Sequence, residues 1–252
     1  MTSGIALALY GHAFVRLRRR GRASGWNALL YVLGVGVGVA AILPPVDRLA
    51  DKLLAAHMGQ HLLLGDVMPL LLVLGVRGPV AVFLLPKHVL VRLARARPLV
   101  WLVSRLLRPR VAFAVWFVAL AAWHIPVAYD TAEAHAAVHA LEHLSFAFGG
   151  VLVWTQIIDP TRRRRLSEGA RAAFAGVVLI AGMALGEVLV ATHPLYPHYV
   201  NVADRPFGWS AGEDQTRAGF VMMAEQLATL GMAAALLLWD HVERVGRELG
   251  PA

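Results

Sequence analysis

Long apolar stretches alternate with short polar segments along the whole chain. Seven of these stretches approach the roughly 20 residues that a helix needs to cross a bilayer. They cover residues 3–15, 26–43, 52–75, 109–129, 134–158, 171–192 and 214–239. The pattern predicts an all-α fold: a polytopic membrane bundle of about seven transmembrane helices, which takes residues 1–252 as a single transmembrane helical domain.

One further apolar stretch departs from this pattern. Residues 79–103 contain Pro86, Pro98 and several arginines, which is typical of a helix lying in the membrane interface and not of a span. Two other prolines, Pro69 and Pro126, fall inside predicted spans. Proline lacks a backbone N–H, so each is expected to loosen the helix around it.

The composition agrees with a membrane protein. The chain is 58% hydrophobic and 16% charged, with a mean hydropathy of +0.60, whereas a soluble domain is about 25% charged. There is no cysteine, which excludes disulfides, iron–sulfur clusters and thiolate metal sites. Any metal would have to be held by histidine, methionine, carboxylate or backbone atoms.

The formal net charge of +8 comes from short segments between the apolar stretches. It therefore indicates membrane topology and not a nucleic-acid partner. Twenty of the 24 lysines and arginines fall in residues 16–22, 76–110, 162–171 and 240–252. Positive segments stay on the cytoplasmic side, which predicts an N-terminus outside and a C-terminus in the cytoplasm. The first basic segment follows the first apolar run, the reverse of a cleavable signal, so residues 3–15 are expected to be a span.

Five histidines fall at similar depth in the outer half of the predicted bundle. His57 and His61 are one helical turn apart, and so are His139 and His143, so each pair leaves one helix face. At about 1.5 Å per residue, His57, His124 and His139 lie roughly 8–9 Å below the outer surface. A single histidine in a membrane is often a packing residue. Five at one level indicate a shared site.

Imidazole is a ligand for zinc, copper, iron and nickel, so the histidines predict a metal site without choosing among these. The carboxylates near the same level are Asp66, Glu142 and Glu187. Of these, either Glu142 or Glu187 is a candidate to orient an imidazole as a hydrogen-bond acceptor. His135 is placed on the same helical ladder as His139. Asp214 opens the last predicted span, where a helix N-cap is an equal alternative to a role at the metal.

Familiar catalytic motifs are absent from the sequence. It contains no G-x-x-x-x-G-K-[ST], no G-x-S-x-G and no H-E-x-x-H. No nucleophile and base are paired along the chain either. We therefore expect a binding protein and not an enzyme.

Several motifs together resemble one known family. They are "HMGQHLLL" from His57, "WHIPVAYDTA" from Trp123, "HALEHLSF" from His139, "PLYPHY" from Pro194 and "DQTRAGF" from Asp214. In this order they resemble the multi-span CtaG-type cytochrome c oxidase assembly family, from about the second span to the end of the chain.

The resemblance implies a membrane-embedded assembly factor for a haem-copper cytochrome c oxidase, with copper bound for insertion or hand-off. It implies a bacterial inner-membrane location, with oxidase subunits and the lipid bilayer as partners and no nucleic acid. The motif histidines that it carries over as metal ligands are His57, His61, His124, His139 and His143. Tyr196, Tyr199, Asp214 and Gln215 also match motif positions.

Two other functions remain open on the sequence alone. A b-type haem protein would use two histidines as axial ligands, although pairs on one helix face suit a compact ion better. A divalent-metal transporter would need a polar path toward the cytoplasmic side, where the sequence offers few charges within the spans.

Overall fold

The computed structural model describes residues 2–19, 24–78, 80, 85–161 and 166–249. Helices make up 85% of it, and these residues contain no strand. The expected all-α class is therefore confirmed. Parts of the basic segments, residues 20–23 and 162–165 among them, lie outside the described residues.

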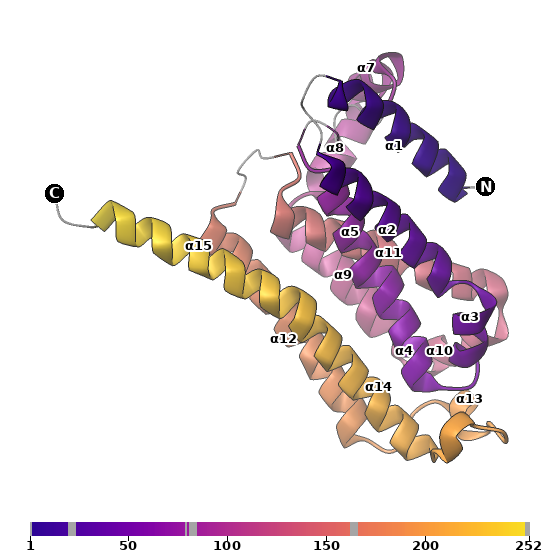
Figure 1. The fold of residues 1–252 in the computed structure, drawn as a ribbon. Coiled ribbons are helices and arrows are strands. Elements are labelled where there is room, and N and C mark those ends of the chain that lie inside the picture. Colours follow the sequence, from indigo (N-terminus) through magenta and orange to yellow (C-terminus); the bar gives the residue numbers. More distant parts are fainter. Residues whose placement is uncertain (1, 20–23, 79, 81–84, 162–165, 250–252) are drawn as a thin grey trace.

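The helices follow one another along the chain with short connections (Figure 1). In order they are α1 (Thr2–Arg18), α2 (Gly25–Ala41), α3 (Pro44–Ala50), α4 (Leu54–Leu62), η1 (Leu63–Val67), α5 (Met68–Gly75), α7 (Lys87–Arg95), α8 (Arg97–Leu106), α9 (Pro109–Trp123), α10 (Pro126–Ala134), α11 (Ala136–Ile158), α12 (Glu168–Ala191), α13 (Pro197–Val200), η2 (Pro206–Gly208), α14 (Ala211–Gln226), η3 (Leu227–Gly231) and α15 (Met232–Leu249). The segments η1 and η3 are π-helical turns, and η2 is a 3-10 turn.

Four helices in the described part of the chain are long and apolar enough to cross a membrane, namely Leu54–Gly75, Ala136–Ile158, Glu168–Ala191 and Ala211–Glu248. The number rises to six if two bent pairs each count as one span. One pair joins α2 to α3 at 51°, and the other joins α8 to α9 at 76°. The helix α1, with 17 residues, is not among them.

The helix predicted over residues 109–129 is shorter in the structure than expected. The helix α9 stops at Trp123, and Ile125 is extended before α10 begins at Pro126. A residue before proline is disfavoured in the α region, because the proline ring clashes with its backbone. His124 therefore lies in a turn and not inside a span.

Pro69 has the loosening effect that its position predicts. The π-helical turn Leu63–Val67 ends two residues before Pro69, which lies in the first turn of α5. A π-turn removes the close approach between the proline ring and the carbonyl four residues earlier, at Gly65. The helix from Leu54 to Gly75 is thus continuous but locally widened.

The helices α7 and α8 bury no residue, as an interfacial segment would not. The segment expected over residues 79–103 extends to Leu106, and residues 79 and 81–84 lie outside the described part. In Figure 1 these two helices are at one end of the bundle, and α3, α10 and α13 are at the other.

Small residues let the helices around the histidines approach closely. A Cβ atom on Gly150 of α11 would lie 2.8 Å from the carbonyl carbon of Gly65 in η1. A Cβ atom on Gly219 of α14 would lie 2.6 Å from the carbonyl oxygen of Gly186 in α12. Glycine at such contacts is the usual means of close helix packing in a membrane. The first contact brings the α4–η1 helix against α11, so that the two histidine pairs face each other.

Candidate metal centre

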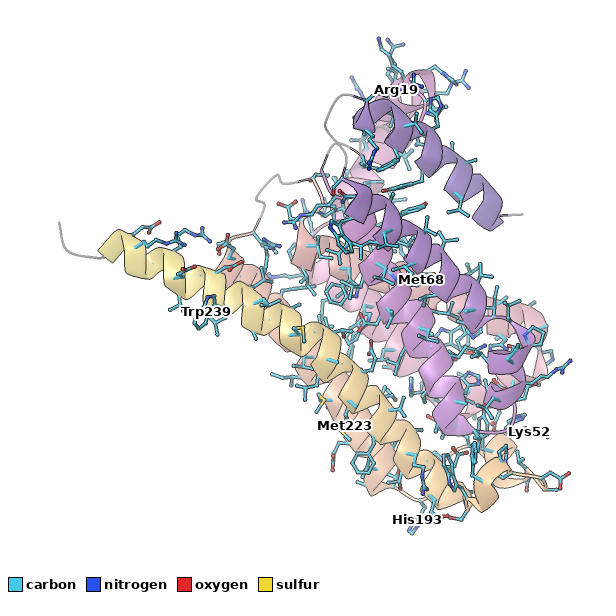
Figure 2. All side chains as sticks on the ribbon, viewed as in Figure 1. Arg19, Lys52, Met68, His193, Met223 and Trp239 are labelled. Atoms are coloured by element: carbon cyan, nitrogen blue, oxygen red, sulfur yellow. The ribbon has the colours of Figure 1, made fainter. Side chains whose placement is uncertain are left out.

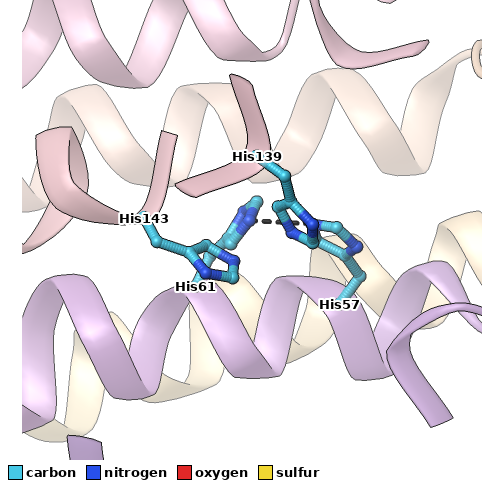
Figure 3. A group of neighbouring side chains, drawn as sticks. All are labelled: His57, His61, His139 and His143. Atoms are coloured by element: carbon cyan, nitrogen blue, oxygen red, sulfur yellow. Dashed lines mark hydrogen bonds between the residues drawn. The ribbon is translucent and has the colours of Figure 1, made fainter. Parts of the chain in front are cut away.

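Four of the five predicted ligand histidines form a square between two helices (Figure 3). His57 and His61 come from α4, and His139 and His143 come from α11. The ring centroids are 4.2 Å apart along α4, 4.3 Å along α11, and 5.3 Å for each pair across the helices. One ligand nitrogen from each ring lies within 4.8 Å of the other three.

These separations are close to those of a metal site. Two nitrogens bound to one first-row ion at tetrahedral geometry would lie about 3.3 Å apart, given bonds of about 2.0–2.1 Å. The Nε2 atoms of His57 and His61 are 2.7 Å apart. The four nitrogens lie within 4.8 Å of one another, so the widest separation would have to shorten by up to about 1.5 Å to reach tetrahedral geometry.

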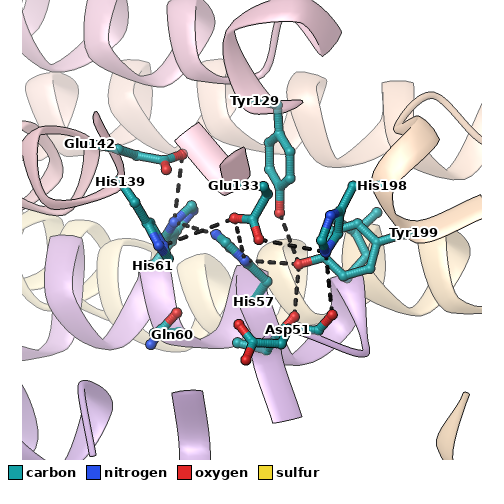
Figure 4. A network of polar contacts seen from close by, with 12 residues as sticks. Asp51, His57, Gln60, His61, Tyr129, Glu133, His139, Glu142, His198 and Tyr199 are labelled. Atoms are coloured by element: carbon teal, nitrogen blue, oxygen red, sulfur yellow. Dashed lines mark hydrogen bonds and ion pairs between the residues drawn. The ribbon is translucent and has the colours of Figure 1, made fainter. Parts of the chain in front are cut away.

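Tyr199 sets the tautomer of His57 (Figure 4). Its hydroxyl donates to the carbonyl oxygen of Ala50 at 2.7 Å and lies 2.9 Å from Nδ1 of His57. A hydroxyl has one proton to give, so Nδ1 of His57 must donate to the tyrosine oxygen. The Nε2 atom then carries the lone pair and faces the square, as a metal ligand requires. Burial raises the pKa of Tyr199 well above its usual value, so the hydroxyl keeps its proton.

Glu133 of α10 is a carboxylate at this site that the sequence analysis did not select. Its Oε1 lies 3.4 Å from Nδ1 of His57 and 4.0 Å from Nε2 of His139, and its Oε2 lies 3.6 Å from Nε2 of His198. Burial, followed by the negative charges of Asp51, Asp47 and Asp130, raises the pKa of Glu133 to about 7. The only signal in the sequence was its place between two histidine motifs.

Glu142 lies on the opposite side of the square. Its side chain is 1% exposed, and its Oε1 is 3.6 Å from Nε2 of His61. The expectation that Glu142 orients an imidazole agrees with this position. Glu187, the other carboxylate considered for that role, is exposed on α12 and has no contact with the histidines among the described interactions. Its expected role is therefore wrong.

Buried atoms without hydrogen-bond partners gather at the square. They are Nδ1 of His61, Nε2 of His139, Nε2 of His143, Oε1 of Glu133 and both carboxyl oxygens of Glu142. Buried polar atoms are almost always paired, because leaving one unpaired costs about 1–3 kcal/mol. Imidazole nitrogens and carboxylate oxygens are together a donor set for a cation, so these residues fit a metal ion.

Asp214 holds α4 in place from the far end of the chain. Its carboxylate accepts hydrogen bonds from the backbone N–H groups of Leu54 at 2.9 Å and Ala55 at 3.0 Å. It therefore caps the helix that carries His57. The alternative that Asp214 caps its own helix is wrong, because Ser210 caps α14.

Two glutamines of the motifs have similar structural roles. Gln60 donates to the carbonyl oxygen of Ala41 at 2.8 Å and so ties α4 to α2. Gln215 accepts from the backbone of Leu195 at 2.7 Å and donates to the carbonyl oxygen of Leu189 at 3.0 Å. Both fix the helices and the loop around the histidines, which explains why these polar residues are buried.

His124 is near the square but not part of it. Its Nδ1 donates to the carbonyl oxygen of Leu120 at 2.8 Å, and its buried Nε2 has no partner. It lines a cavity of about 50 Å³ together with His61 and Asp66. His135 is exposed and bonds to the carbonyl oxygen of Thr131, so the expected ladder from His135 to His139 does not form.

Comparison with known proteins identifies a family for this chain. A family model for the cytochrome c oxidase caa3 assembly factor (Caa3_CtaG) matches residues 8–244, which include every residue of the square and its surroundings. The search of curated proteins and the search of solved structures found no match.

Proposed function

This chain belongs to the family of cytochrome c oxidase caa3 assembly factors, and we propose that it holds copper in the outer half of the membrane for assembly of a haem-copper oxidase. Copper is the cargo in this proposal, held by His57, His61, His139 and His143 and then handed on. The observation that carries it is the square of four imidazoles, within which ligand atoms lie within 4.8 Å of one another.

The chemistry of the donor set supports a soft or borderline ion. All four primary donors are imidazole nitrogens, and the chain has no thiolate to offer. Copper stands near the top of the affinity order for divalent first-row ions, and imidazole suits it. The family adds the reason to choose copper over zinc, since a haem-copper oxidase contains that metal.

His124 has a secondary place in this proposal. It lies outside the group of four, but its Nε2 is buried, lacks a partner and lines the same cavity as His61. We propose that it is a transient ligand and not part of the resting site.

Hydrogen bonding to Tyr199 orients His57 for metal binding. Its Nδ1–H donates to Tyr199, which leaves the Nε2 lone pair facing the other rings. Glu133 lies between this histidine, His139 and His198, with Asp47 and Asp51 near it. These carboxyl groups make the outer side of the square attractive to a cation approaching from the exterior.

For topology we propose seven spans, a single domain over residues 1–252, and a bacterial inner-membrane location, with the N-terminus outside and the C-terminus in the cytoplasm. The distribution of basic residues supports this orientation. Figure 2 labels Arg19 at one end of the bundle and Lys52 and His193 at the opposite end. Arg19 belongs to a basic segment expected on the cytoplasmic side. Lys52 and His193 lie at helix ends expected on the outer side of the membrane. Lipid and oxidase subunits are the proposed partners.

A haem electron-transfer function has less support. Axial histidines must lie on opposite faces of a porphyrin, and the four rings are separated by only 4.2–5.3 Å along the sides of the square. The proposal is therefore for a non-enzymatic metal-handling protein.

The test is to replace His57 and His143 by alanine together and to measure copper in the purified protein and oxidase activity in cells. We expect copper content and oxidase activity both to fall by about tenfold or more, because two of four ligands are lost. Binding by the wild type should also weaken as the pH falls, because a protonated imidazole has no lone pair left to bind a metal.

The matched control is His135→Ala, which removes an exposed histidine at the start of the same helix α11. It should leave copper content and oxidase activity unchanged. A double variant that accumulates in the membrane, retains its copper and supports normal oxidase assembly would contradict the proposed function.

A further inference from the structure

A pair of carboxyl groups lies deeper in the bundle than the histidine square. Asp66 is in the π-helical turn η1, and Glu225 is at the end of α14, next to the second π-helical turn η3. The two carboxyl groups are within hydrogen-bonding distance of each other. Both helices in which they lie are among those long enough to cross a membrane.

Asp66 accepts a hydrogen bond at each of its two carboxyl oxygens, as an ionised carboxylate does. The indole Nε1–H of Trp154 donates to its Oδ1, and the hydroxyl of Thr229 donates to its Oδ2 at 2.6 Å. Both carboxyl oxygens of Glu225 are buried. The Thr229 hydroxyl is near this carboxyl group too, but its single proton goes to Asp66. A carboxylate only accepts, so two carboxyl groups in contact require a proton between them. The arrangement assigns that proton to Glu225, which donates it to Asp66.

No cation neutralises this pair in the described part of the chain. None of the ion pairs there includes Asp66 or Glu225. Two adjacent carboxylates cannot both be ionised in a low-dielectric interior without a counter-charge. The titratable groups that share the adjoining cavity with Asp66 are His61 and His124.

A cavity lies between Asp66 of the pair and His61 of the square. It measures about 50 Å³, and its lining includes His61 at the square, His124, and Asp66 and Gln226 at the deeper end. Gln226 is 4% exposed, and its Oε1 has no hydrogen-bond partner. An unpaired amide oxygen in a cavity of this size can bind water or a cation. π-helical turns within membrane-spanning helices are also frequent at functional sites.

We propose that the Asp66–Glu225 pair is a proton-binding site. Its proton leaves when a monovalent cation binds at the histidine square. Before binding, the pair has one proton and one negative charge. After binding, the proton has left to solvent, the pair has two negative charges, and the cation supplies one positive charge. The net charge buried in the bundle is the same in both states.

This exchange rests on the proposed function, because it takes the histidine square as the place where the cation binds. Its physical reason is the cost of a net charge in a membrane interior, which is several kilocalories per mole for a single ion. Neutral imidazoles cannot provide compensation, since they bind a metal without losing charge. Glu142 is a single carboxyl group at the square itself, 3.6 Å from His61, whereas Asp66 and Glu225 are two carboxyl groups in contact that share one proton.

The test is a titration of the purified protein with Ag⁺, a soft monovalent ion that undergoes no redox change, in weakly buffered solution with a pH indicator. At pH 8, Glu133, whose pKa is about 7, is already mostly ionised and contributes little. We expect about one proton released per bound ion in the wild type. Asp66→Asn and Glu225→Gln should each lower that number by at least about threefold while Ag⁺ still binds.

The matched control is Glu187→Gln, which removes an exposed carboxyl group of α12 and should release protons as the wild type does. Equal release from the wild type and the two pair variants would overturn the proposal, and so would binding of Ag⁺ without release. Failure of the wild type to bind Ag⁺ would contradict the proposed function as well as the exchange.

A second measurement needs no metal. Infrared spectra of the metal-free protein should contain a carbonyl band of a protonated carboxylic acid that shifts in D₂O and disappears in Glu225→Gln. This band would support the proton-binding pair even if Ag⁺ did not bind. Its absence from the wild type would overturn the assignment of the proton to Glu225.

Discussion

His57 and His61 on α4 and His139 and His143 on α11 have the same spacing, yet the surroundings of the two pairs differ. The α4 pair is 1% and 6% exposed, and Tyr199 fixes the orientation of His57. The start of α4 is capped by Asp214, whereas the start of α11 has no side-chain cap.

The α11 pair has looser surroundings. His139 is 21% exposed, and the Nε2 atoms of both histidines lack a hydrogen-bond partner. One pair is therefore held in position before any ion arrives, and the other has free nitrogens and room to turn. Such an arrangement combines a preorganised half, which lowers the cost of binding, with a half that can adjust to accept or release an ion.

The largest expected effect comes from removing a ligand from either half. His61→Ala and His143→Ala should each weaken copper binding by about 100-fold, because each removes one of four donors. The two variants should differ in rate: loss of His61, from the preorganised half, should speed transfer of copper to a competing chelator more than loss of the adjustable His143 does. Stopped-flow transfer to a chromogenic chelator measures both quantities. Identical transfer rates in the two variants would remove the distinction between the halves.

The next effect tests what holds the fixed half. Tyr199→Phe removes the hydroxyl that accepts from Nδ1 of His57, and it should weaken copper binding by about tenfold, as losses of ligand-orienting partners do. Tyr196→Phe is the matched control, since the Tyr196 hydroxyl donates to the carbonyl oxygen of His124 and does not contact the square. Isothermal titration of both variants makes the comparison. Equal losses in the two would mean that the tyrosines act only through stability.

The smallest effect concerns the cap on α4. Asp214→Ala leaves the N–H groups of Leu54 and Ala55 unpaired and takes from Arg205 its ion-pair partner. We expect a loss of about 1–3 kcal/mol in the free energy of unfolding, measured by thermal unfolding in detergent. Copper affinity of the folded fraction should fall by less than about threefold. Ser210→Ala, which removes the cap of α14, is the control, and it should lower stability without changing affinity.

The two histidine pairs could be predicted from the sequence because their geometry is local. A spacing of four residues places two side chains on one helix face whatever the rest of the chain does. That the pairs face each other depends on Gly65 and Gly150 meeting between α4–η1 and α11. The sequence contains those glycines but not their contact.

The other predictions are wrong where the position of a residue depends on a distant segment or on a break in a helix. From the sequence, Asp214 is predicted to cap its own helix, because nothing relates it to Leu54, which is 160 residues away. The span expected to reach Tyr129 ends at Trp123, since Pro126 restricts Ile125. The sequence does not predict a role for Glu133 for the same reason. Glu133 lies on α10, which is a separate helix because of this break.

The central claim is that four imidazoles from α4 and α11 bind one copper ion together. X-ray absorption at the copper edge, on protein purified without chelator, tests it most directly. We expect three or four nitrogen neighbours at about 2.0 Å, with imidazole outer-shell scattering that diminishes in both His61→Ala and His143→Ala. Copper bound mainly by oxygen or sulfur, or a spectrum that neither variant changes, would contradict it.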